Sequence, residues 1–519
     1  MKKLISLLLL SAFLNSQAQE AWVFENHFDK GFQILEAYDG GTLIVANKTW
    51  QSFNGKIIKL NKAGELLWEH SMELNDDGID PLTIVEDLQG NLIIGGRTFQ
   101  YNSNGDGFLL KLDACGKQLW FKKIGIENES DNVKYLILDK EDNLYFNHYT
   151  GLTDYRFNLK KTDAEGNLIW NYNYFVGWEN NVWGSNVKDV IRTKDKGFLM
   201  IGSVYAPPYY DQGSTIGYLR SGMVKTDSLG IEQWRSIYRW EEDVPDSIKM
   251  SIAGNLSELT NGTIIVSATD INTTYFTPMV YKVNENGNLL WSKNLAEPGI
   301  AYKNTRSVVL NDSIVLLACS VAEPIDLYGP KHLEVYKLDA MGTKIGEYIN
   351  TDRTTILRDF RLNKDSSSVY ILPAARYQNE TYNLYALKLN PYTLLLDTFL
   401  ATDNTSYDYY CPEGVEDQSI YFPEDSLPLA EVVSAKRQLR IAPNPAIDFT
   451  YLYFDVKNHS KTLKLEVHDA LGNLKDSYPL LAQNGRVYQN LSNYAPGIYS
   501  VSLSTNNKLL ESSKIVVNK

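Results

Sequence analysis

The sequence predicts an all-β protein: a seven-bladed β-propeller, with six or eight blades as the error range, followed by a small C-terminal β-sandwich. Three observations lead to this prediction. A ten-residue motif recurs at intervals of 50 to 64 residues, a second apolar motif precedes each copy, and helical periodicity and helix caps are nearly absent.

The first motif places Lys, Asp or Asn, Gly and then Trp at fixed spacing, as in KLDACGKQLW at 111–120. Asp or Asn closes a turn on its own backbone, and Gly accepts the positive φ that such a turn requires. A degenerate seventh copy, LKLNPYTLLL, begins at Leu387, and Gly346 replaces Trp in the sixth copy. The glycines of the six regular copies are Gly64, Gly116, Gly166, Gly230, Gly287 and Gly342.

The second motif is a polar turn followed by an alternating apolar run, as in YDGGTLIVAN from Tyr38 and TNGTIIVSA from Thr260. Period-two alternation with β-branched residues predicts strands. Together the two motifs give four short strands per period, here called A to D, which is typical of a propeller blade. The recurrent Trp of strand D is expected to act as an apolar wedge between blades. AWVFENHF from Ala21 is predicted to be an extra D strand that completes the seventh blade, with Trp22 in the wedge position.

The repeat resembles the tryptophan-docking motifs of quinoprotein dehydrogenases and of lipoprotein-assembly propellers. Its Asp-to-Gly spacing is one residue shorter, and no quinone-binding set accompanies it. We therefore expect no cofactor.

The last part of the chain contains a second set of ordered motifs. Its residues are Pro443, Asn444, Pro445, Asp469, Gly472, Gly497, Tyr499 and Lys514. Together they resemble the type A C-terminal sorting domain of type IX secretion cargo; an ordinary immunoglobulin-like module is the alternative. The resemblance implies the type IX secretion machinery as a partner, and a secreted or outer-membrane cell-surface location.

The chain is expected to comprise a signal peptide at 1–18, a propeller at 19–410, a linker at 411–438 and a sorting domain at 439–519. Residues 1–18 have two lysines, an apolar run and small residues before the cleavage site, which is the pattern of an export signal. The linker is acidic, carries scattered prolines and is the expected processing region. No later segment has the roughly 18 to 20 apolar residues that a spanning helix needs, so the product should not span a membrane.

Composition excludes several classes of function. The net charge is −13, and the absence of a basic run argues against nucleic acid or another polyanion as partner. The three separated cysteines, Cys115, Cys319 and Cys411, rule out a disulfide framework and a zinc cluster, and leave one long-range bridge open. NSNGDG at 102–107 is interpreted as a polar hairpin rather than a calcium loop, because it has too few carboxylates.

Strand direction gives a candidate ligand face. Because the strands alternate, the A–B and C–D turns lie on one face and the variable B–C and D–A loops on the other. Aromatic planes beside carboxylates suit a glycan or protein ligand, although such aromatics also pack long loops internally. The candidate residues on this face are Trp178, Glu179, Trp183, Tyr209, Tyr210, Asp211, Trp240 and Glu241.

Catalysis has less support in the sequence than binding. Glu179, Asp211 and Glu241 are among the loop carboxylates that a polysaccharide hydrolase or lyase could use, but any acidic chain offers such a set. No HExxH, GxSxG or phosphate-binding loop is present. The sequence therefore favours an extracellular binding module over an enzyme or a purely structural surface-layer protein, and no catalytic or metal-binding residue is assigned.

Overall fold

The structure is a computed structural model. It describes residues 23–397 and 439–518, apart from these segments: 27–28, 49–53, 73–77, 100–104, 126–129, 151–156, 175–182, 207–217, 238–250, 271–275, 296, 298–299, 323–329, 352–354, 377–381, 443–445, 457–462, 481–483 and 506–507. The described part contains strands and turns and no helix.

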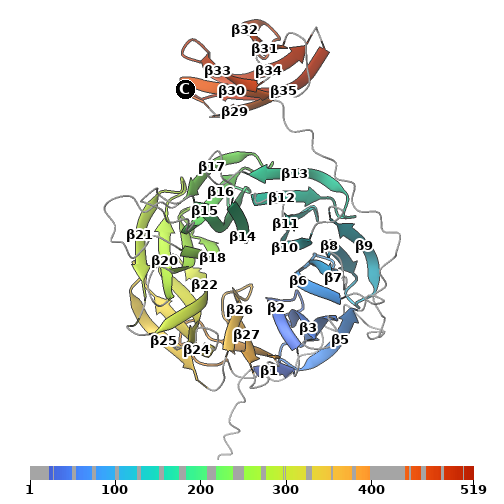
Figure 1. Ribbon diagram of the computed structural model, residues 1–519, viewed down its shortest axis with the longest axis vertical. Helices are drawn as coiled ribbons and strands as arrows, with labels where there is room; N and C mark the ends of the chain where they lie inside the picture. Colours follow the sequence, from blue (N-terminus) through green and yellow to red (C-terminus); the bar gives the residue numbers. More distant parts are fainter. Residues whose placement is uncertain are drawn as a thin grey trace, which may run out of the picture.

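Seven four-stranded antiparallel sheets form the ring of blades (Figure 1). The strands of blades one to four are β2(Asp29–Glu36), β3(Thr42–Lys48), β4(Gly55–Leu60), β5(Leu66–Met72), β6(Gly78–Glu86), β7(Leu92–Phe99), β8(Gly107–Leu112), β9(Gln118–Ile124), β10(Asp131–Leu138), β11(Leu144–Thr150), β12(Phe157–Thr162), β13(Leu168–Tyr174), β14(Trp183–Arg192), β15(Phe198–Ala206), β16(Tyr218–Thr226) and β17(Glu232–Ile237). Those of blades five to seven are β18(Ser251–Glu258), β19(Ile264–Asp270), β20(Thr277–Val283), β21(Leu289–Asn294), β22(Ala301–Asn311), β23(Ile314–Ala322), β24(Pro330–Leu338), β25(Lys344–Asn350), β26(Thr355–Leu362), β27(Val369–Arg376) and β28(Tyr382–Leu389), with β1(Val23–Asn26) as the last.

The ring is closed by the N-terminal strand. β1 pairs antiparallel with β28, with Val23 opposite Leu387 and Asn26 opposite Leu384, and so supplies the D strand of the seventh blade. The predicted extra D strand and the seven-bladed architecture are therefore confirmed, while Trp22 lies outside the described residues. Seven hydrophobic clusters each join two neighbouring blades, and one of them joins the seventh blade to the first.

Four of the five recurrent tryptophans pack against the turn glycine of the following blade, whereas the atoms nearest to Gly116 belong to His70. A Cβ atom at Gly287 would lie 2.6 Å from Trp234, and one at Gly342 would lie 2.9 Å from Trp291. The same contact joins Gly166 to Trp120 and Gly230 to Trp170. The glycine is thus required twice over, since its φ is positive and the space for a side chain is filled by an indole. This explains why the motif pairs a glycine with a tryptophan, and it confirms the wedge.

The contact between the sixth and seventh blades has no tryptophan and is packed differently. Gly346 stands where the other copies have Trp, and a Cβ atom at this glycine would lie 3.7 Å from Leu394 of the next blade. Leu394 belongs to the degenerate seventh motif and has a φ of 58°. The side chain from the following turn therefore takes up space that the indole fills elsewhere.

Every A strand, the innermost of its blade, carries a bulge. In each blade the pairing of strands A and B shifts register near the middle of strand A, for example between Gly31 and Gln33 and between Val187 and Asp189. At or just after the bulge, one equivalent position is polar in all seven blades. We call it the ring position; its residues are Gln33, Thr83, Tyr135, Asp189, Asn255, Ser307 and Asp359.

Six of the seven ring-position side chains hydrogen-bond to the next blade. Gln33 donates to the carbonyl of Ile84 at 3.0 Å and accepts from its amide at 3.1 Å. Asp359 accepts from the amide of Ile34 at 3.1 Å, which links the seventh blade to the first. The other four bonds are Leu136 N to Thr83 Oγ1, Tyr135 Oη to Val187 O, Leu256 N to Asp189 Oδ2 and Ser307 N to Asn255 Oδ1. These bonds satisfy backbone groups of the A strands, which are edge strands with no strand neighbour on the side of the axis.

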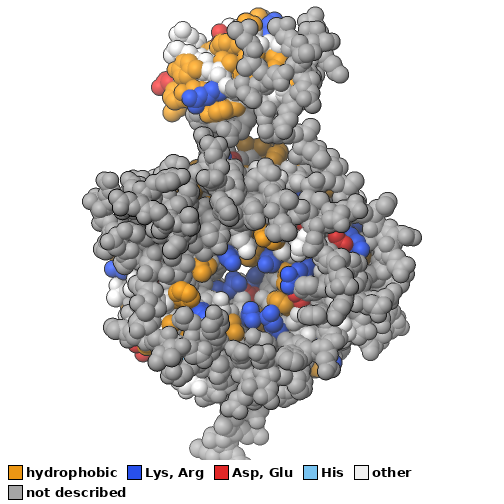
Figure 2. All heavy atoms as spheres, viewed as in Figure 1, with side chains coloured by type: hydrophobic (Ala, Val, Ile, Leu, Met, Phe, Trp, Pro, Cys, Tyr) orange, Lys and Arg blue, Asp and Glu red, His pale blue; other side chains and the backbone are white. Residues whose placement is uncertain are grey.

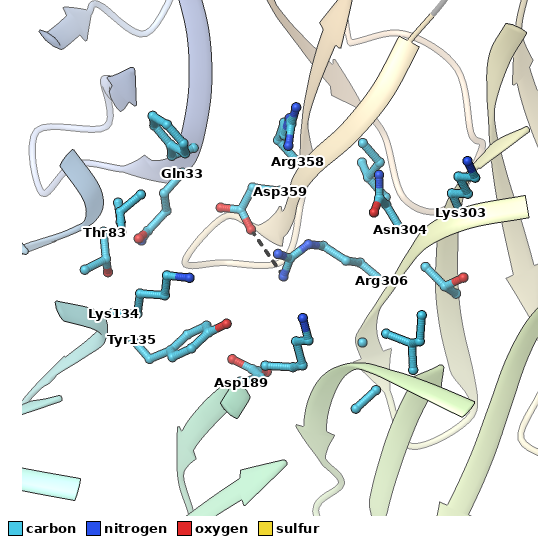
Figure 3. Close-up of a pocket in the computed structure, with 18 of the residues that line it drawn as sticks. Gln33, Thr83, Lys134, Tyr135, Asp189, Lys303, Asn304, Arg306, Arg358 and Asp359 are labelled. Carbon is cyan, nitrogen blue, oxygen red and sulfur yellow. Dashed lines mark ion pairs between the residues drawn. The ribbon is translucent and has the colours of Figure 1, made fainter. Parts of the chain in front are cut away.

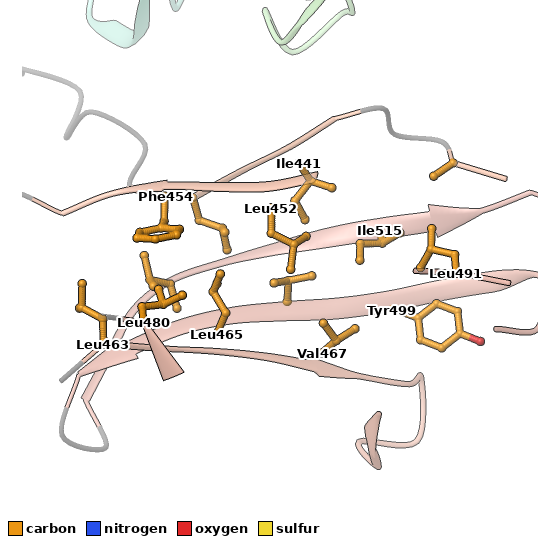
Figure 4. Close-up of a cluster of buried hydrophobic side chains, with 14 of the residues drawn as sticks. Ile441, Leu452, Phe454, Leu463, Leu465, Val467, Leu480, Leu491, Tyr499 and Ile515 are labelled. Atoms are coloured by element: carbon orange, nitrogen blue, oxygen red, sulfur yellow. The ribbon is translucent and has the colours of Figure 1, made fainter. Parts of the chain in front are cut away.

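The C-terminal part forms a two-sheet β-sandwich, as predicted. One sheet has the order β29(Leu439–Ala442), β30(Phe449–Asp455), β33(Asn484–Asn490). The other has the order β32(Leu474–Leu480), β31(Leu463–His468), β34(Gly497–Thr505), β35(Lys508–Val517). Inward-facing apolar side chains such as Leu452, Leu465 and Ile515 fill the space between the sheets (Figure 4).

The two described cysteines differ in their chemical state. Cys115 forms a disulfide, and Cys319 is a buried free thiol whose pKa is raised by burial. Cys411 lies outside the described residues. None of the described segments is a helix long and apolar enough to cross a bilayer.

The wedge predicts a specific cost for losing an indole. Trp234→Ala removes the contact with Gly287 and the hydrogen bond from Trp234 Nε1 to the carbonyl of Glu285 at 2.9 Å. We expect the free energy of unfolding to fall by about 2 to 4 kcal/mol, measured by urea denaturation. Leu290→Ala, in an exposed position of a neighbouring D strand, should cost less than about 0.5 kcal/mol. Equal losses for the two variants would contradict the wedge.

Candidate functional site

The residue before each ring position faces the propeller axis. We call this the axial position; its residues are Phe32, Leu82, Lys134, Lys188, Gly254, Arg306 and Arg358. All seven line one cavity of about 580 Å³ at the centre of the ring. A bulge turns its extra residue out of the regular alternation of the strand, and in five blades the axial residue is such an extra residue. Lys134 and Arg306 are instead the paired residues that border the bulges of their strands. Figure 2 shows Lys and Arg side chains gathered around this central opening.

This central channel is strongly cationic. Seven Lys or Arg side chains line it against two carboxylates, Asp189 and Asp359, although the whole chain has a net charge of −13. Four of the cations occupy axial positions and form what we call the axial quartet, which is Lys134, Lys188, Arg306 and Arg358. The remaining three are Arg97, Lys303 and Arg361.

The positive charges of the channel are only partly neutralised. Arg361 Nε donates to Asp359 Oδ2 at 2.8 Å, and Arg306 lies 4.0 Å from the other oxygen of the same carboxylate (Figure 3). Arg97 pairs with Asp80 at 2.9 Å. In the described part of the chain, no carboxylate forms an ion pair with Lys134 or Lys188.

The two axial lysines are destabilised in their charged form. Burial, followed by the positive charges of Lys188, Arg97 and Arg306, lowers the pKa of Lys134 to about 8. Burial and the nearby Arg306 likewise lower the pKa of Lys188. Desolvation and repulsion between like charges both disfavour an ammonium group, so these residues cost stability in the free protein.

Both carboxylates of the channel are held by structural hydrogen bonds. Asp189 accepts backbone N–H bonds from Val190 at 3.0 Å and from Leu256 at 2.9 Å. Burial nevertheless raises the pKa of Asp189. Asp359 accepts from Ile34 and Arg361. Because both side chains tie blades together, neither is placed as a free acid or base.

Aromatic side chains stand beside the cations. Lys30 Nζ lies 5.3 Å from the ring centre of Phe32, and Lys303 Nζ lies 5.9 Å from that of Phe276. Tyr135 also lines the channel, with its hydroxyl 3.4 Å from the carbonyl of Val187 and with burial raising its pKa well above the ordinary range.

Two non-glycine residues of the channel have a left-handed backbone. Tyr135 has a φ of 57° and Asn304 a φ of 53°, and each belongs to the bulge of its A strand. Side chains other than Gly rarely adopt this conformation, and such strain concentrates at functional sites. The strained backbone thus coincides with the cationic channel.

The predicted ligand face is only partly described. Trp178, Glu179, Tyr209, Tyr210, Asp211, Trp240 and Glu241 lie outside the described residues. Trp183 begins strand β14, opposite Tyr205, and its side chain is not described. Three residues that line the channel show which face it reaches. Arg97 and Thr269 lie near the ends of B strands, and Phe276 lies just before a C strand. The channel therefore extends to the face that carries the B–C and D–A loops.

The axial quartet was not predicted from the sequence. The sequence did contain a signal for the quartet, which is the interval between its members. Lys134 and Lys188 are 54 residues apart and Arg306 and Arg358 are 52 apart, and each precedes a polar ring-position residue. Aligning the A strands would have found them, but these strands have the weakest motif. The absence of a basic run argued against polyanions, whereas the fold gathers the cations from separate blades.

No metal site accompanies the channel within the described residues, where no group of three or more His, Cys, Asp or Glu is placed to bind an ion. Asp106 and Gly107 of the 102–107 hairpin are described, and Gly107 begins strand β8. The start of that hairpin, from 102 to 104, lies outside the described residues.

The C-terminal motifs take up structural positions in the sandwich. Asp469 accepts N–H bonds from Leu471 and Asn473, and Gly472 has a φ of 84°, so the two residues form a tight turn. Gly497 begins β34, and Tyr499 packs in the core with its hydroxyl 2.9 Å from the carbonyl of Ala495. Lys514 lies in β35, and Pro443, Asn444 and Pro445 are outside the described residues.

Comparison with known families identifies this domain. Residues 440–518 match the secretion system C-terminal sorting domain. The chain is therefore type IX secretion cargo, an exported β-propeller protein that is secreted or attached to the cell surface.

Comparison with solved structures finds matches at low sequence identity. A polysaccharide lyase family 25 ulvan lyase aligns at 7% identity and a TM-score of 0.48, covering 71% of this chain and 96% of that chain. The same type of enzyme bound to -[GlcA(1-4)Rha3S]- aligns at 7% identity and a TM-score of 0.47, covering 71% of this chain and 96% of that chain. A Dyadobacter fermentans protein of unknown function aligns at 11% identity and a TM-score of 0.39, covering 71% of this chain and 97% of that chain. No curated protein matches the chain. These similarities are too low to assign an activity.

The lowered pKa of Lys134 makes a prediction about stability. Between pH 8 and 10.5 the unfolded chain binds a proton at this lysine that the native state has lost, so the penalty for Lys134 is complete below pH 8 and fades above it. Lys134→Met should raise the free energy of unfolding at pH 7 by about 1 to 3 kcal/mol, and by less at pH 10. Urea denaturation at both pH values measures this. Lys140→Met, at an exposed turn, is the control, and a loss of stability in Lys134→Met at pH 7 would contradict the account.

Proposed function

We propose that the exported propeller is a recognition module that binds an extracellular glycan in its central channel. The observation that carries the proposal is an open channel of about 580 Å³ lined by aromatic, amide and cationic side chains, with residues from all seven inner strands. This volume falls within the range of about 300 to 1,000 Å³ that is typical of ligand pockets.

The lining suits carbohydrate chemistry. A sugar ring has an apolar face that stacks on an aromatic plane and a rim of hydroxyls that needs donors and acceptors. Phe32 and Phe276 offer such planes, and Asn132, Asn304 and Thr269 offer polar groups around them. The loop residues Trp178, Trp183 and Trp240 are predicted from the sequence to lie on the same face, and we propose that they extend the site beyond the channel.

A glycan fits the channel better than a protein ligand does. A stable protein interface buries about 800 Å² on each partner, which requires a broad surface rather than a narrow opening. A glycan chain end can enter the channel directly. Protein recognition therefore remains an outcome of the test below and is not part of the proposal.

The hydrolase form of the alternative has no specific support among the described residues. Glycoside hydrolysis uses two carboxylates in acid and base or nucleophile roles. Asp189 and Asp359 already accept structural hydrogen bonds, and Glu179, Asp211 and Glu241 lie outside the described residues. Incubating the protein with the glycan that it binds, and looking for new reducing ends or unsaturated products, separates the two functions.

A glycan array with the full exported chain tests the proposal. Phe276→Ala should weaken binding of the best glycan by roughly 5- to 30-fold, which corresponds to losing about 1 to 2 kcal/mol of aromatic contact. Tyr392→Ala, an exposed aromatic on the outer turn of the seventh blade, should leave binding unchanged.

Trp178→Ala and Trp240→Ala extend the same experiment to the loops. A loss of affinity in either variant supports their part in the site. Glycan binding that survives Phe276→Ala, or a blank glycan array together with binding to a protein ligand, would refute a glycan site in the channel.

A further inference from the structure

The axial quartet is not required by the fold. In six of the seven blades, the ring-position side chain supplies a hydrogen bond to the next blade, and none of these bonds involves an axial side chain. At the axial position the other three blades carry Phe32, Leu82 and Gly254. The bulge therefore also forms with an apolar side chain or with no side chain at this position. Folding therefore does not explain why four blades carry Lys or Arg.

The quartet also opposes folding. Lys188 and Arg306 both disfavour the charged form of Lys134, Arg306 disfavours that of Lys188, and Asp359 is shared between Arg306 and Arg361. Natural proteins keep such local conflicts mainly where function needs them. What the site lacks is negative charge, and a ligand would have to supply it.

The arrangement of the axial quartet indicates where the negative charges of a ligand would bind. Lys134 and Lys188 belong to the adjacent blades three and four, and Arg306 and Arg358 to the adjacent blades six and seven. In a seven-membered ring these two pairs face each other across the axis, separated by the neutral axial residues of blades five, one and two. Figure 3 shows Lys134 and Arg306 extending into the opening from opposite blades.

The aromatic residues lie in the gaps between the two cationic pairs. Phe32 comes from blade one, and Phe276 from the B–C connection of blade five. A ligand that alternates apolar ring faces with anionic groups matches this pattern. The negatively charged remainder of the protein disfavours a long polyanion on the outer surface, so the channel selects a chain end.

We infer that the ligand is an acidic glycan whose carboxylate or sulfate groups bind between the two cationic pairs of the axial quartet. This inference rests on the proposed function, because it specifies the ligand of the same channel. Each charge-assisted hydrogen bond from Lys or Arg to such a group is stronger than a neutral one and is favoured further by the low dielectric of the channel. Binding would also relieve the repulsion within the quartet.

Three probes with one sugar backbone test the inference: short oligomers of dextran, carboxymethyl-dextran and dextran sulfate. Calorimetry with the full exported chain at pH 7 and 50 mM salt should give at least about tenfold tighter binding for a charged probe than for dextran. Comparison of the two charged probes distinguishes carboxylate from sulfate as the group recognised. Raising the salt should weaken charged-probe binding.

The double variant Lys134→Met, Lys188→Met should weaken charged-probe binding by about 10- to 100-fold, a much larger loss than any change in dextran binding. Loss of folding is not expected, because both changes remove repulsion, and a thermal melt checks this. The matched control is Lys117→Met, Lys140→Met, which removes the same charge from exposed turns.

The outcomes separate this inference from the proposed function. If a neutral glycan binds in a manner sensitive to Phe276→Ala while the lysine variant changes nothing, the acidic ligand is refuted and the glycan site stands. If a single-stranded oligonucleotide of equal charge outcompetes both charged dextrans, the ligand class is wrong. If no sugar probe binds and the glycan array is also blank, the proposed function fails with the inference.

Discussion

The hydrogen bond from the bulge of one A strand to the next blade is the contact on which the rest of the propeller site depends. Each A strand is the inner edge of its sheet, so backbone groups on its axial side have no strand partner. Polar side chains such as Gln33, Asp189 and Asp359 satisfy these groups across the blade interface. The same local geometry turns the preceding residue toward the axis, so one irregularity both joins the blades and forms the lining of the channel.

The inner and outer edges of the blades are stabilised by different chemistry. At the outer edge an indole such as Trp234 covers the glycine of the next turn, and this contact depends on shape and apolar area. At the inner edge the contacts are hydrogen bonds, because buried backbone groups must be paired. Between the two edges the seven hydrophobic clusters fill the interfaces. The blades can therefore vary their axial residues without disturbing either edge.

Much of the fold could be predicted from the sequence, because the outer motif combines a turn, a glycine and a tryptophan in a fixed order. The closing strand at Val23–Asn26 could be predicted as well, since a ring must be completed by a strand of the right type. The channel could not, because Lys134, Lys188, Arg306 and Arg358 are far apart in the chain and only the ring brings them together. A net charge of −13 describes the whole surface and hides a local cationic site.

Export and the proposed recognition belong to separate parts of this protein. The sorting domain directs the chain to type IX secretion, and the propeller presents a channel whose charge is opposite to that of the whole protein. The central claim is that the axial cations bind the anionic groups of a ligand. The affinity of Leu82→Lys for the charged dextran probe tests this most directly, because it adds a fifth axial cation in a neutral blade. The account predicts affinity about 3- to 10-fold higher at low salt together with lower stability, whereas unchanged or weaker binding in a folded variant would contradict it.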